Sequence, residues 1–299
     1  MEKDKNFCPI CKCNFIDDQP IKLSVTNLYN CSHCGVVFAK PNFHNPNKDF
    51  FDSYQVDQWL KYYRMFRKKS HKQFVEKHKE LFKNGISVLD IGCAAGWFLD
   101  EVKRKFSTAI TVGMEPSPFM KDKINKSYLI YWFGAEQLGK VKGKFDMVTL
   151  WNVFEHFSDP HKIIRLVTTK IKRNGYLVLS VPNQKGLISR IAYFLARISG
   201  GILSMPLEEL FQTDNAFGHL FHYDRQSLSK LLGKNDFKVL WCEGVDIVDV
   251  SNVRQRLKVT TNHGDEIKQQ ALATVVAQLT RIASVTDFQD EIVVATRKI

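Results

Sequence analysis

The stretch from Ser87 to Val102, SVLDIGCAAGWFLDEV, most constrains what this chain can fold into. Its first five residues are mainly apolar and β-favouring, which predicts a buried strand, and helical spacing resumes at Trp97. Between the two lies the segment Gly92 to Gly96, which has almost no side-chain bulk where the chain must turn. Small residues there let the backbone approach a ligand, and the following helix N-terminus offers N–H groups. We therefore predict a ligand-binding turn.

Strand and helix patterns alternate from Gly85 onward. Such alternation builds an α/β fold, a parallel sheet with helices on both faces, in which ligands bind at the carboxyl ends of the strands. The expected strands span 87–91, 109–115, 129–133, 145–153 and 175–183, and the expected helices span 96–105, 119–126 and 160–171.

Two acidic residues end the first two strands and indicate the charge of the ligand. Asp90 faces the turn, where its carboxylate would repel a pyrophosphate but attract a cationic or hydroxyl-bearing group. Glu115 ends the second strand, where an acid can accept hydrogen bonds from both hydroxyls of a ribose. The pattern predicts a nucleoside that carries positive charge.

Four cysteines near the start have the spacing of a zinc site. They form two pairs, Cys8-x-x-Cys11 and Cys31-x-x-Cys34, and two such turns facing each other complete a tetrahedral Zn²⁺ site. Gly35 follows the second pair and suits the turn around the metal, whereas Lys12 stands in the equivalent place after the first. Four sulfurs leave no open position for substrate, so we expect structural zinc, with Cys13 as a bystander.

With these motifs, the chain resembles the class I S-adenosylmethionine-dependent methyltransferases. VLDIGCAAGWFL (88–99) is similar to their first motif, D-x-G-x-G-x-G, with Ala94 in place of the middle glycine. GMEP (113–116) resembles their ribose-binding acid motif, and GAEQL (134–138) resembles the adenine-side motif G-D-A-E-x-L without its Asp. LWNVFEHFSDP and the segment 218–240 resemble the ubiquinone-biosynthesis-type subgroup. The cysteine-bearing front end resembles zinc-ribbon methyltransferases of bacterial surface-glycan and natural-product pathways.

The resemblance implies a Rossmann-like, seven-stranded methyltransferase sheet with helices on both faces and a small N-terminal zinc ribbon. It also implies S-adenosylmethionine as the cofactor. The residues that it places at the cofactor are Asp90, Gly92, Cys93, Ala94, Gly96, Glu115, Pro116, Ala135, Glu136, Trp151 and Asn152.

Two histidines are the candidate catalytic residues. A hydroxyl or thiol acceptor must lose a proton during methyl transfer, and histidine suits that task. His156 follows the fourth strand at the mouth of the site and is the first candidate for the base, the alternative being a helix-start histidine that packs or caps. His222 lies in a segment that would cover the pocket and could orient the substrate.

The patterns divide the chain into a zinc ribbon (1–45), a basic helical linker (46–84) and a methyltransferase domain (85–299). Within the last, residues 184–222 are expected to form a lid or substrate segment, and 250–287 an insertion with a helical run. The stretch 187–205 is apolar on one helical face with arginines on the other. A lid over the pocket is the favoured interpretation, and peripheral contact with a membrane is the alternative.

The net charge of +12 points toward anionic partners, and much of the excess lies in 61–83. A solvated helix face is the simpler explanation, so nucleic acid is an alternative rather than the favoured partner. The N-terminus leads into no apolar run and 187–205 contains arginines, so we expect a cytoplasmic protein without a transmembrane segment. The predicted function is methylation of oxygen or nitrogen on a small-molecule or sugar acceptor. An RNA base methyltransferase and a non-catalytic, cofactor-binding regulatory protein are the alternatives.

Overall fold

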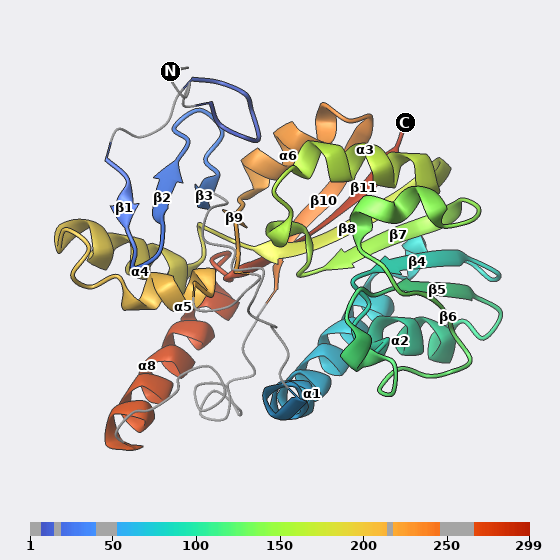
Figure 1. The fold of residues 1–299 in the computed structure, drawn as a ribbon, viewed down its shortest axis with the longest axis horizontal. Coiled ribbons are helices and arrows are strands. Elements are labelled where there is room, and N and C mark those ends of the chain that lie inside the picture. The colour runs from blue at the N-terminus through green and yellow to red at the C-terminus, as the bar shows by residue number, and fades with distance from the viewer. Residues whose placement is uncertain (1–6, 15–18, 40–52, 214–217, 246–265) are drawn as a thin grey trace.

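A computed structural model describes residues 7–14, 19–39, 53–213, 218–245 and 266–299. A seven-stranded sheet forms the centre of the molecule (Figure 1). Five neighbouring strands are parallel, whereas the C-terminal strand runs antiparallel to both of its neighbours. In spatial order the strands are β10 (Phe237–Val245), β11 (Glu291–Lys298), β8 (Ile171–Pro182), β7 (Phe145–Trp151), β4 (Ser87–Ile91), β5 (Ile110–Met114) and β6 (Leu129–Tyr131).

Helices cover both faces of this sheet, because its central strands are apolar on both sides. In β4, Leu89 packs toward the layer of α3 (Pro160–Lys170) and α6 (Arg225–Gly233). Its neighbour Val88 points the other way, into a cluster with residues of α1 (Ser53–Lys77) and α2 (Trp97–Lys105). Short 3-10 turns connect the layers at Lys79–Leu81, Pro118–Met120, Ala135–Lys140 and Phe154–His156.

One expectation about the helices was wrong. The predicted helix over 119–126 is only the 3-10 turn Pro118–Met120 followed by turns, because prolines at 116 and 118 start the segment and Met120 and Ile124 are buried as separate anchors. The strands predicted in 85–183 are parallel to one another, as expected, and the sheet becomes mixed only where β11 inserts between β10 and β8 in the opposite direction. The five strands predicted in 85–183 are present.

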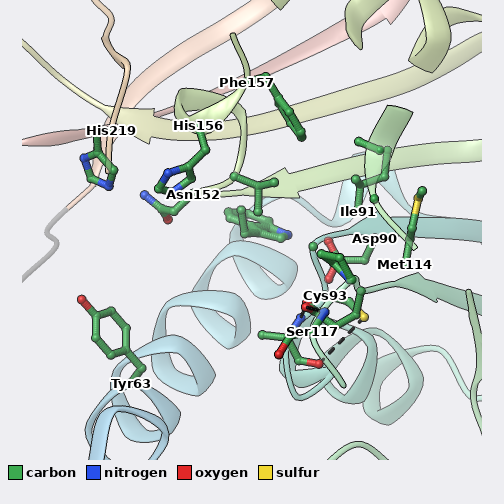
Figure 2. Close-up of a pocket in the computed structure, with 18 of the residues that line it drawn as sticks. Tyr63, Asp90, Ile91, Cys93, Met114, Ser117, Asn152, His156, Phe157 and His219 are labelled. Atoms are coloured by element: carbon green, nitrogen blue, oxygen red, sulfur yellow. Dashed lines mark hydrogen bonds between the residues drawn. The ribbon is translucent and has the colours of Figure 1, made fainter. Parts of the chain in front are cut away.

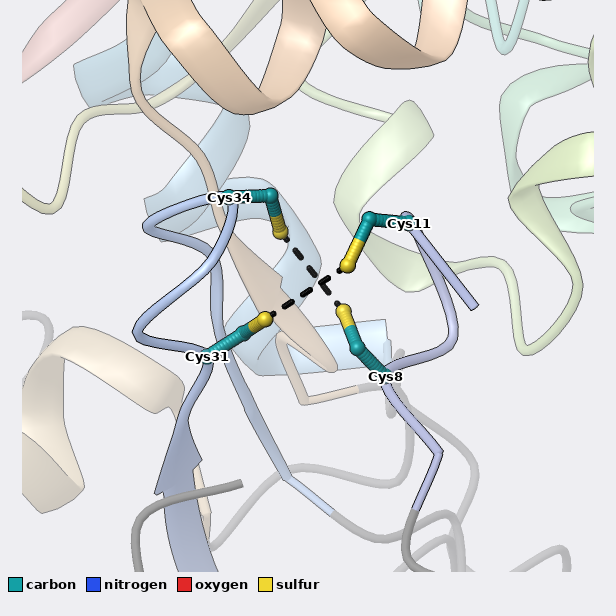
Figure 3. Close-up of side chains that lie close together, drawn as sticks. All are labelled: Cys8, Cys11, Cys31 and Cys34. Carbon is teal, nitrogen blue, oxygen red and sulfur yellow. Dashed lines mark hydrogen bonds between the residues drawn. The ribbon is translucent and has the colours of Figure 1, made fainter. Parts of the chain in front are cut away.

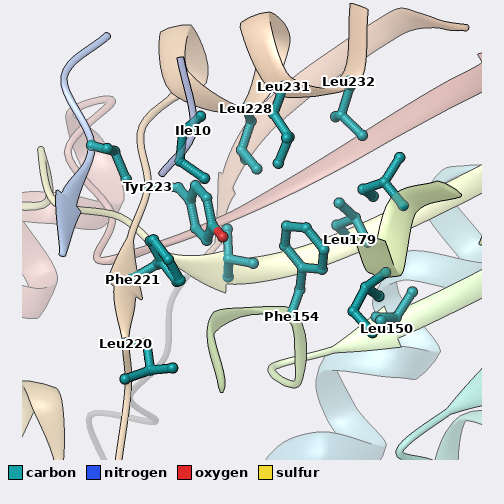
Figure 4. Packing of buried hydrophobic residues seen from close by; sticks show 14 of the residues in the cluster. Ile10, Leu150, Phe154, Leu179, Leu220, Phe221, Tyr223, Leu228, Leu231 and Leu232 are labelled. Atoms are coloured by element: carbon teal, nitrogen blue, oxygen red, sulfur yellow. The ribbon is translucent and has the colours of Figure 1, made fainter. Parts of the chain in front are cut away.

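The N-terminal residues form a second, small sheet that is joined to the larger domain. It contains β1 (Ile21–Lys22), β2 (Asn27–Asn30), β3 (Val37–Ala39) and β9 (Phe221–His222). Strand β9 comes from the predicted lid segment and pairs with β3, with Val37 opposite His222. The two parts also share a core, since buried Ile10 lies in one cluster with Tyr223 and Leu228 (Figure 4).

The segment expected to be a basic linker contains α1, which packs on the sheet through Phe74 and Val75. Part of its positive charge is paired within the chain, as in Lys77 with Glu243 at 2.6 Å. After β8 come α4 (Leu187–Ile198) and α5 (Met205–Phe211), and α8 (Glu266–Val285) lies in the predicted insertion, whose residues 250–265 lie outside the described part. Among the described residues, no helix is long and apolar enough to span a membrane.

Candidate active site and metal centre

The small residues after β4 are required by close contacts in the turn. Gly92 has a φ of +70°, and a Cβ atom on it would lie 2.5 Å from Cγ2 of Val153 in the segment after β7. Gly113 in β5 faces the same turn, where an added Cβ would lie 2.6 Å from Sγ of Cys93. Burial raises the pKa of the Cys93 thiol, so this cysteine acts as a small packing residue rather than a nucleophile.

Glu115 is held at the turn by two backbone amides. The Ala94 N–H donates to Oε2 at 2.9 Å and the Ser117 N–H donates to Oε1 at 2.8 Å. Ala94 reaches this position with a left-handed φ of +47°, a conformation that costs about 1–2 kcal/mol for a residue with a Cβ. A carboxylate has about four acceptor positions, so two remain to receive the hydroxyls of a ribose.

Asp90 lies deeper in the same site. It is 2 % exposed, and the Thr149 hydroxyl donates to its Oδ1 at 2.7 Å. Burial raises the pKa of Asp90 to about 7, and the nearby Glu115 carboxylate adds to the shift. A cationic ligand beside Asp90 would favour its charged form, so the site has a stronger electrostatic preference for cations than for phosphates.

A cavity of about 830 Å³ lies at the carboxyl ends of β4, β5 and β7 (Figure 2). That volume is in the range of pockets that enclose small-molecule ligands. One residue predicted to contact the cofactor, Gly96, is not among those that line the cavity. It is the N-cap of α2, with a φ of +77°. The other sequence-predicted cofactor and catalytic residues all line the cavity: Asp90, Gly92, Cys93, Ala94, Glu115, Pro116, Ala135, Glu136, Trp151, Asn152, His156 and His222.

His156 lies in the 3-10 turn after β7 and points toward the cavity, beside Asn152 (Figure 2). Its Nδ1 lies 3.3 Å from the carbonyl oxygen of Gly218, which can only accept a hydrogen bond. Nδ1 therefore carries the proton in the neutral ring, and Nε2 holds the lone pair that a general base needs. The ring of His219 packs edge-on against it, with centroids 4.9 Å apart.

His222 also borders the cavity, but both of its ring nitrogens face protein groups. Nε2 lies 3.2 Å from the carbonyl oxygen of Leu210, and Nδ1 lies 3.4 Å from the Tyr193 hydroxyl. Its ring stacks on Phe211 and is 1 % exposed, and burial lowers its pKa to about 3. These contacts favour His156 over His222 as the base.

The site contains residues that sequence reasoning did not assign. Arg67 of α1 forms an ion pair with Glu291 of β11 at 3.4 Å, and both line the cavity. His71, one turn further along α1, is buried against Trp151, and neither ring nitrogen has a hydrogen-bond partner among the described residues. In the sequence, the only indication of Arg67 and His71 was that these two polar residues lie four positions apart, and so on one face of the basic helix.

Glu155 was noted in the sequence only as part of a motif, and the structure buries it completely. Burial raises the pKa of its carboxyl group to about 8, so the protonated form dominates at neutral pH. Its Oε1 lies 3.9 Å from Nε2 of His219, and the polar atoms of Glu155, His156 and His219 lie within 4.8 Å of one another. His156 and His219, which line the cavity, thus belong to a compact polar cluster with the buried Glu155.

The segment predicted to cover the pocket supplies one of its walls. Ser189 of α4, Glu209 and Leu210 at the end of α5, Gln212 just after it, and the two later histidines line the cavity. The opposite surface of this segment exposes large apolar side chains, including Phe194, Ile198 and Met205. The arrangement suits the lid interpretation, and the exposed apolar surface leaves membrane contact as the alternative.

The four predicted metal ligands converge in the N-terminal part (Figure 3). Sγ of Cys8 lies 3.6 Å from that of Cys34, and Cys11 and Cys31 are separated by the same distance. Four sulfurs bound at about 2.3 Å to one tetrahedral zinc ion would lie about 3.8 Å apart, so the observed spacing fits the metal. All four are free thiols rather than disulfides.

The two cysteine turns have the same backbone form. Lys12 N–H donates to Cys8 O at 2.9 Å, and Gly35 N–H donates to Cys31 O at 2.7 Å. Lys12 adopts a left-handed φ of +64° where Gly35 has +83°, which explains how lysine occupies the place of a glycine. Side chains of the large domain bind carbonyls of both turns, among them Gln184 to Gly35 O at 2.7 Å and Lys234 to Cys11 O at 3.1 Å.

Three features define a Rossmann-like, nucleoside-binding protein. They are a seven-stranded α/β sheet with an antiparallel last strand, an acid near the carboxyl end of the first strand, and a glycine-rich turn after it. A family model described as a methyltransferase domain matches residues 46–241, about two thirds of the chain. The chain therefore belongs to the class I S-adenosylmethionine-dependent methyltransferases.

Known proteins agree with this assignment. The ubiquinone biosynthesis O-methyltransferase of Escherichia coli O127:H6 is 28% identical over 108 residues, which are 34% of this chain and 45% of the relative. The chain thus spans less than half the length of that curated relative. A SAM-dependent methyltransferase from Archaeoglobus fulgidus has the same fold, with a TM-score of 0.53, 16% identity and coverage of 80% of this chain and 99% of that one. A structure of the Haloferax volcanii Trm112 methyltransferase activator in complex with a methyltransferase is similar with a TM-score of 0.55 and 14% sequence identity. The match covers 82% of this chain and 96% of that one.

Proposed function

We propose that this protein transfers the methyl group of S-adenosylmethionine to an oxygen or nitrogen of a small-molecule or sugar acceptor. The observation that carries the proposal is one cavity in which the Glu115 and Asp90 carboxylates lie at one end and His156 at the other. The cofactor supplies an electrophilic methyl group on a sulfonium, and the protein supplies alignment, exclusion of water and removal of a proton.

Each end of the cavity has a separate role in this proposal. Glu115 accepts the ribose hydroxyls, and Asp90 favours the positively charged end of the cofactor over a phosphate. His156 receives the proton of the acceptor at Nε2, because Nδ1 faces the Gly218 carbonyl. The lid residues around Leu210 and His219 shield the reacting atoms from water.

Features of the small sheet support a small acceptor over RNA. Single-stranded RNA is recognised by aromatic side chains that stack on exposed bases. In the small sheet, Phe38 and Phe221 are 6 % and 3 % exposed and stack on each other, so they are not available for bases. The contacts of Asp90 and Glu115 support cofactor binding, since the Ala94 N–H still donates to Glu115. His156 at the same cavity, with Nδ1 facing the Gly218 carbonyl, supports a catalytic protein over a non-catalytic one.

We further propose that the Cys8, Cys11, Cys31 and Cys34 thiolates hold a structural Zn²⁺. The four sulfurs have the spacing of a tetrahedral site and are all buried, which leaves no position for substrate. Lys234 donates to a carbonyl of the first turn and so brings positive charge near the thiolates. In this role the metal stabilises the ribbon, and through β3 it supports the strand that carries His222.

The cofactor assignment is tested by Glu115→Ala. Removing the Glu115 carboxylate should weaken binding of S-adenosylhomocysteine by about 1.5–3 kcal/mol, because the ribose hydroxyls of the ligand lose a charged hydrogen-bond acceptor. Isothermal titration calorimetry measures the change, with Glu80→Ala as the control because the Glu80 side chain is 63% exposed and outside the cavity. Unchanged affinity in Glu115→Ala would show that the nucleoside is bound elsewhere.

The acceptor class is tested separately with labelled S-adenosylmethionine. Purified protein is incubated with sugars and small phenolic or amino compounds in one series and with RNA in another. We expect label in the first series only. Transfer to RNA alone would establish the alternative acceptor, and the site residues would then need a different assignment.

A further inference from the structure

The charged groups of the cofactor cavity restrict the kind of acceptor that it can hold. Arg67 is the only lysine or arginine among the described residues that line the cavity. Six carboxylates line it: Asp90, Glu115, Glu136, Glu209, Asp290 and Glu291. An acceptor that carries a phosphate or carboxylate group would meet like charge there. The lining therefore favours a neutral acceptor over an anionic one.

The ion pair of Arg67 with Glu291 keeps hydrogen-bonding capacity for a ligand. The two atoms of the pair lie 3.4 Å apart, and the side chains are 13% and 2% exposed. A guanidinium has five N–H donors, of which only the one to Glu291 meets an oxygen in the described part of the chain. Oε2 of Glu291 is buried there without a hydrogen-bond partner. The pair thus has no net charge but offers both donors and an acceptor.

This ion pair is linked to the end of the cavity that carries the candidate base. The Ser180 hydroxyl donates to Oε1 of Glu291, and its oxygen lies 3.4 Å from Oδ1 of Asn152. Asn152 lies beside His156 (Figure 2). Burial is the main cause of the raised pKa of Glu155, the neighbour of His156, and the two charges of the ion pair also act on that carboxyl group. The pair therefore lies near the residues that would receive the acceptor.

His71 adds a further polar group one helical turn beyond Arg67. Its ring lines the cavity, and burial keeps it neutral by lowering its pKa, so it has one donor and one acceptor nitrogen. A buried polar atom without a partner costs about 1–3 kcal/mol. A phenol has a single hydroxyl, which must lie at His156 to react, and so it leaves these groups unpaired. A sugar has additional hydroxyls, each of which can donate and accept.

We propose that Arg67 and Glu291 bind adjacent hydroxyls of a neutral sugar, and that they hold a further hydroxyl of that sugar at His156 for methylation. The inference rests on the proposed methyl transfer and selects the acceptor class within it. The guanidinium donates to one sugar oxygen, and the Glu291 carboxylate accepts from the neighbouring hydroxyl. An acceptor with a carboxylate in place of a hydroxyl is disfavoured, because its charge would lie beside Glu291 as well as beside Arg67.

Binding and transfer on the full chain test the acceptor class. The probes are glucose and galactose, the matched glucuronic and galacturonic acids, and phenol. Calorimetry measures their binding to the protein saturated with S-adenosylhomocysteine, and labelled S-adenosylmethionine measures transfer. We expect at least one of the two neutral sugars to bind saturably and to accept the methyl group. Its uronic acid and phenol should bind at least about 10-fold more weakly, since each loses hydrogen bonds to charged groups.

Two variants separate the partners of the ion pair. Arg67→Met should raise the KM for the sugar about 10–100-fold and leave the affinity for S-adenosylhomocysteine unchanged. Glu291→Gln removes the counter-charge of Arg67, so it should reduce the discrimination against the uronic acid. Arg64→Met is the matched control, because Arg64 is an exposed arginine of the same helix and does not line the cavity. Thermal unfolding of each variant separates a folding defect from a binding defect.

The outcomes distinguish this inference from the proposed function. Methylation of phenol without binding of either sugar would overturn the inference and leave methyl transfer to a small molecule standing. An unchanged KM in folded Arg67→Met, or an equal change in Arg64→Met, would overturn the role of the ion pair. If the unaltered protein does not bind S-adenosylhomocysteine, both the proposed function and the inference fail.

Discussion

We expect His156→Ala to bind S-adenosylmethionine with nearly normal affinity and to turn over about 10²–10⁴-fold more slowly, because the acceptor loses its general base. The ring lies at the cavity beside Asn152, and its contact with the Gly218 carbonyl leaves Nε2 as the basic atom. Calorimetry measures cofactor binding, and single-turnover transfer of a labelled methyl group measures the chemical step. For a hydroxyl acceptor, part of the rate should return at higher pH.

His222→Ala is the informative companion to this variant. His222 is buried, stacks on Phe211 and contacts the Leu210 carbonyl through Nε2, so its loss should lower thermal stability more than the rate per folded molecule. A normal rate in His156→Ala together with a large loss in folded His222→Ala would reverse the assignment. Loss of cofactor binding in His156→Ala would instead give that residue a structural role.

Replacing Cys31 by serine should remove the metal and destabilise the whole chain. Loss of a group that only hydrogen-bonds to a metal ligand already lowers metal affinity about 10–100-fold. Loss of a ligand itself should lower the affinity for zinc by more than that. The ribbon shares a core with the large domain through Ile10 and pairs with it through β3, so metal loss should lower the thermal midpoint of the entire protein. Metal analysis and thermal unfolding provide the two measurements.

Cys13→Ser is the matched control, because Cys13 is close to the cluster without completing the set of four. Its Sγ lies 3.9 Å from the carbonyl oxygen of Cys11, and it is only partly buried. We expect this variant to keep one zinc ion per chain and a normal thermal midpoint. Equal loss of zinc in the two variants, or retention in both, would contradict the proposed ligand set.

Patterns in the sequence predicted the central sheet well where the signal was local. The strand that became β4 and the helix α2 follow from apolar spacing around a run of small residues. The predicted helix over 119–126 failed, because its spacing came from Met120 and Ile124, which are buried separately after a proline-bearing turn. The antiparallel direction of β11 could not be predicted, since direction depends on the chain path between strands rather than on the strand itself.

The basic segment 61–83 shows how tertiary contacts change the meaning of a charge pattern. In sequence it is a run of lysines and arginines that indicates a solvated helix or an anionic partner. In the structure, Arg67 pairs with Glu291 beside the cofactor cavity, and Lys83 pairs with Asp146 at 2.9 Å. These partners are far away in sequence, so no local pattern could reveal them.

The sequence by itself determined the features that depend on short stretches of backbone: the turn at Gly92, the acids that end two strands, and the two cysteine turns. Each of these needs particular residue types at a fixed spacing, because left-handed backbone, small bulk or paired thiols are required locally. Only the tertiary structure decided which distant groups share a cavity. The pairing of β3 with β9 and the burial of Glu155 arise from long-range packing, in which burial shifts pKa values and sets the partners of each histidine.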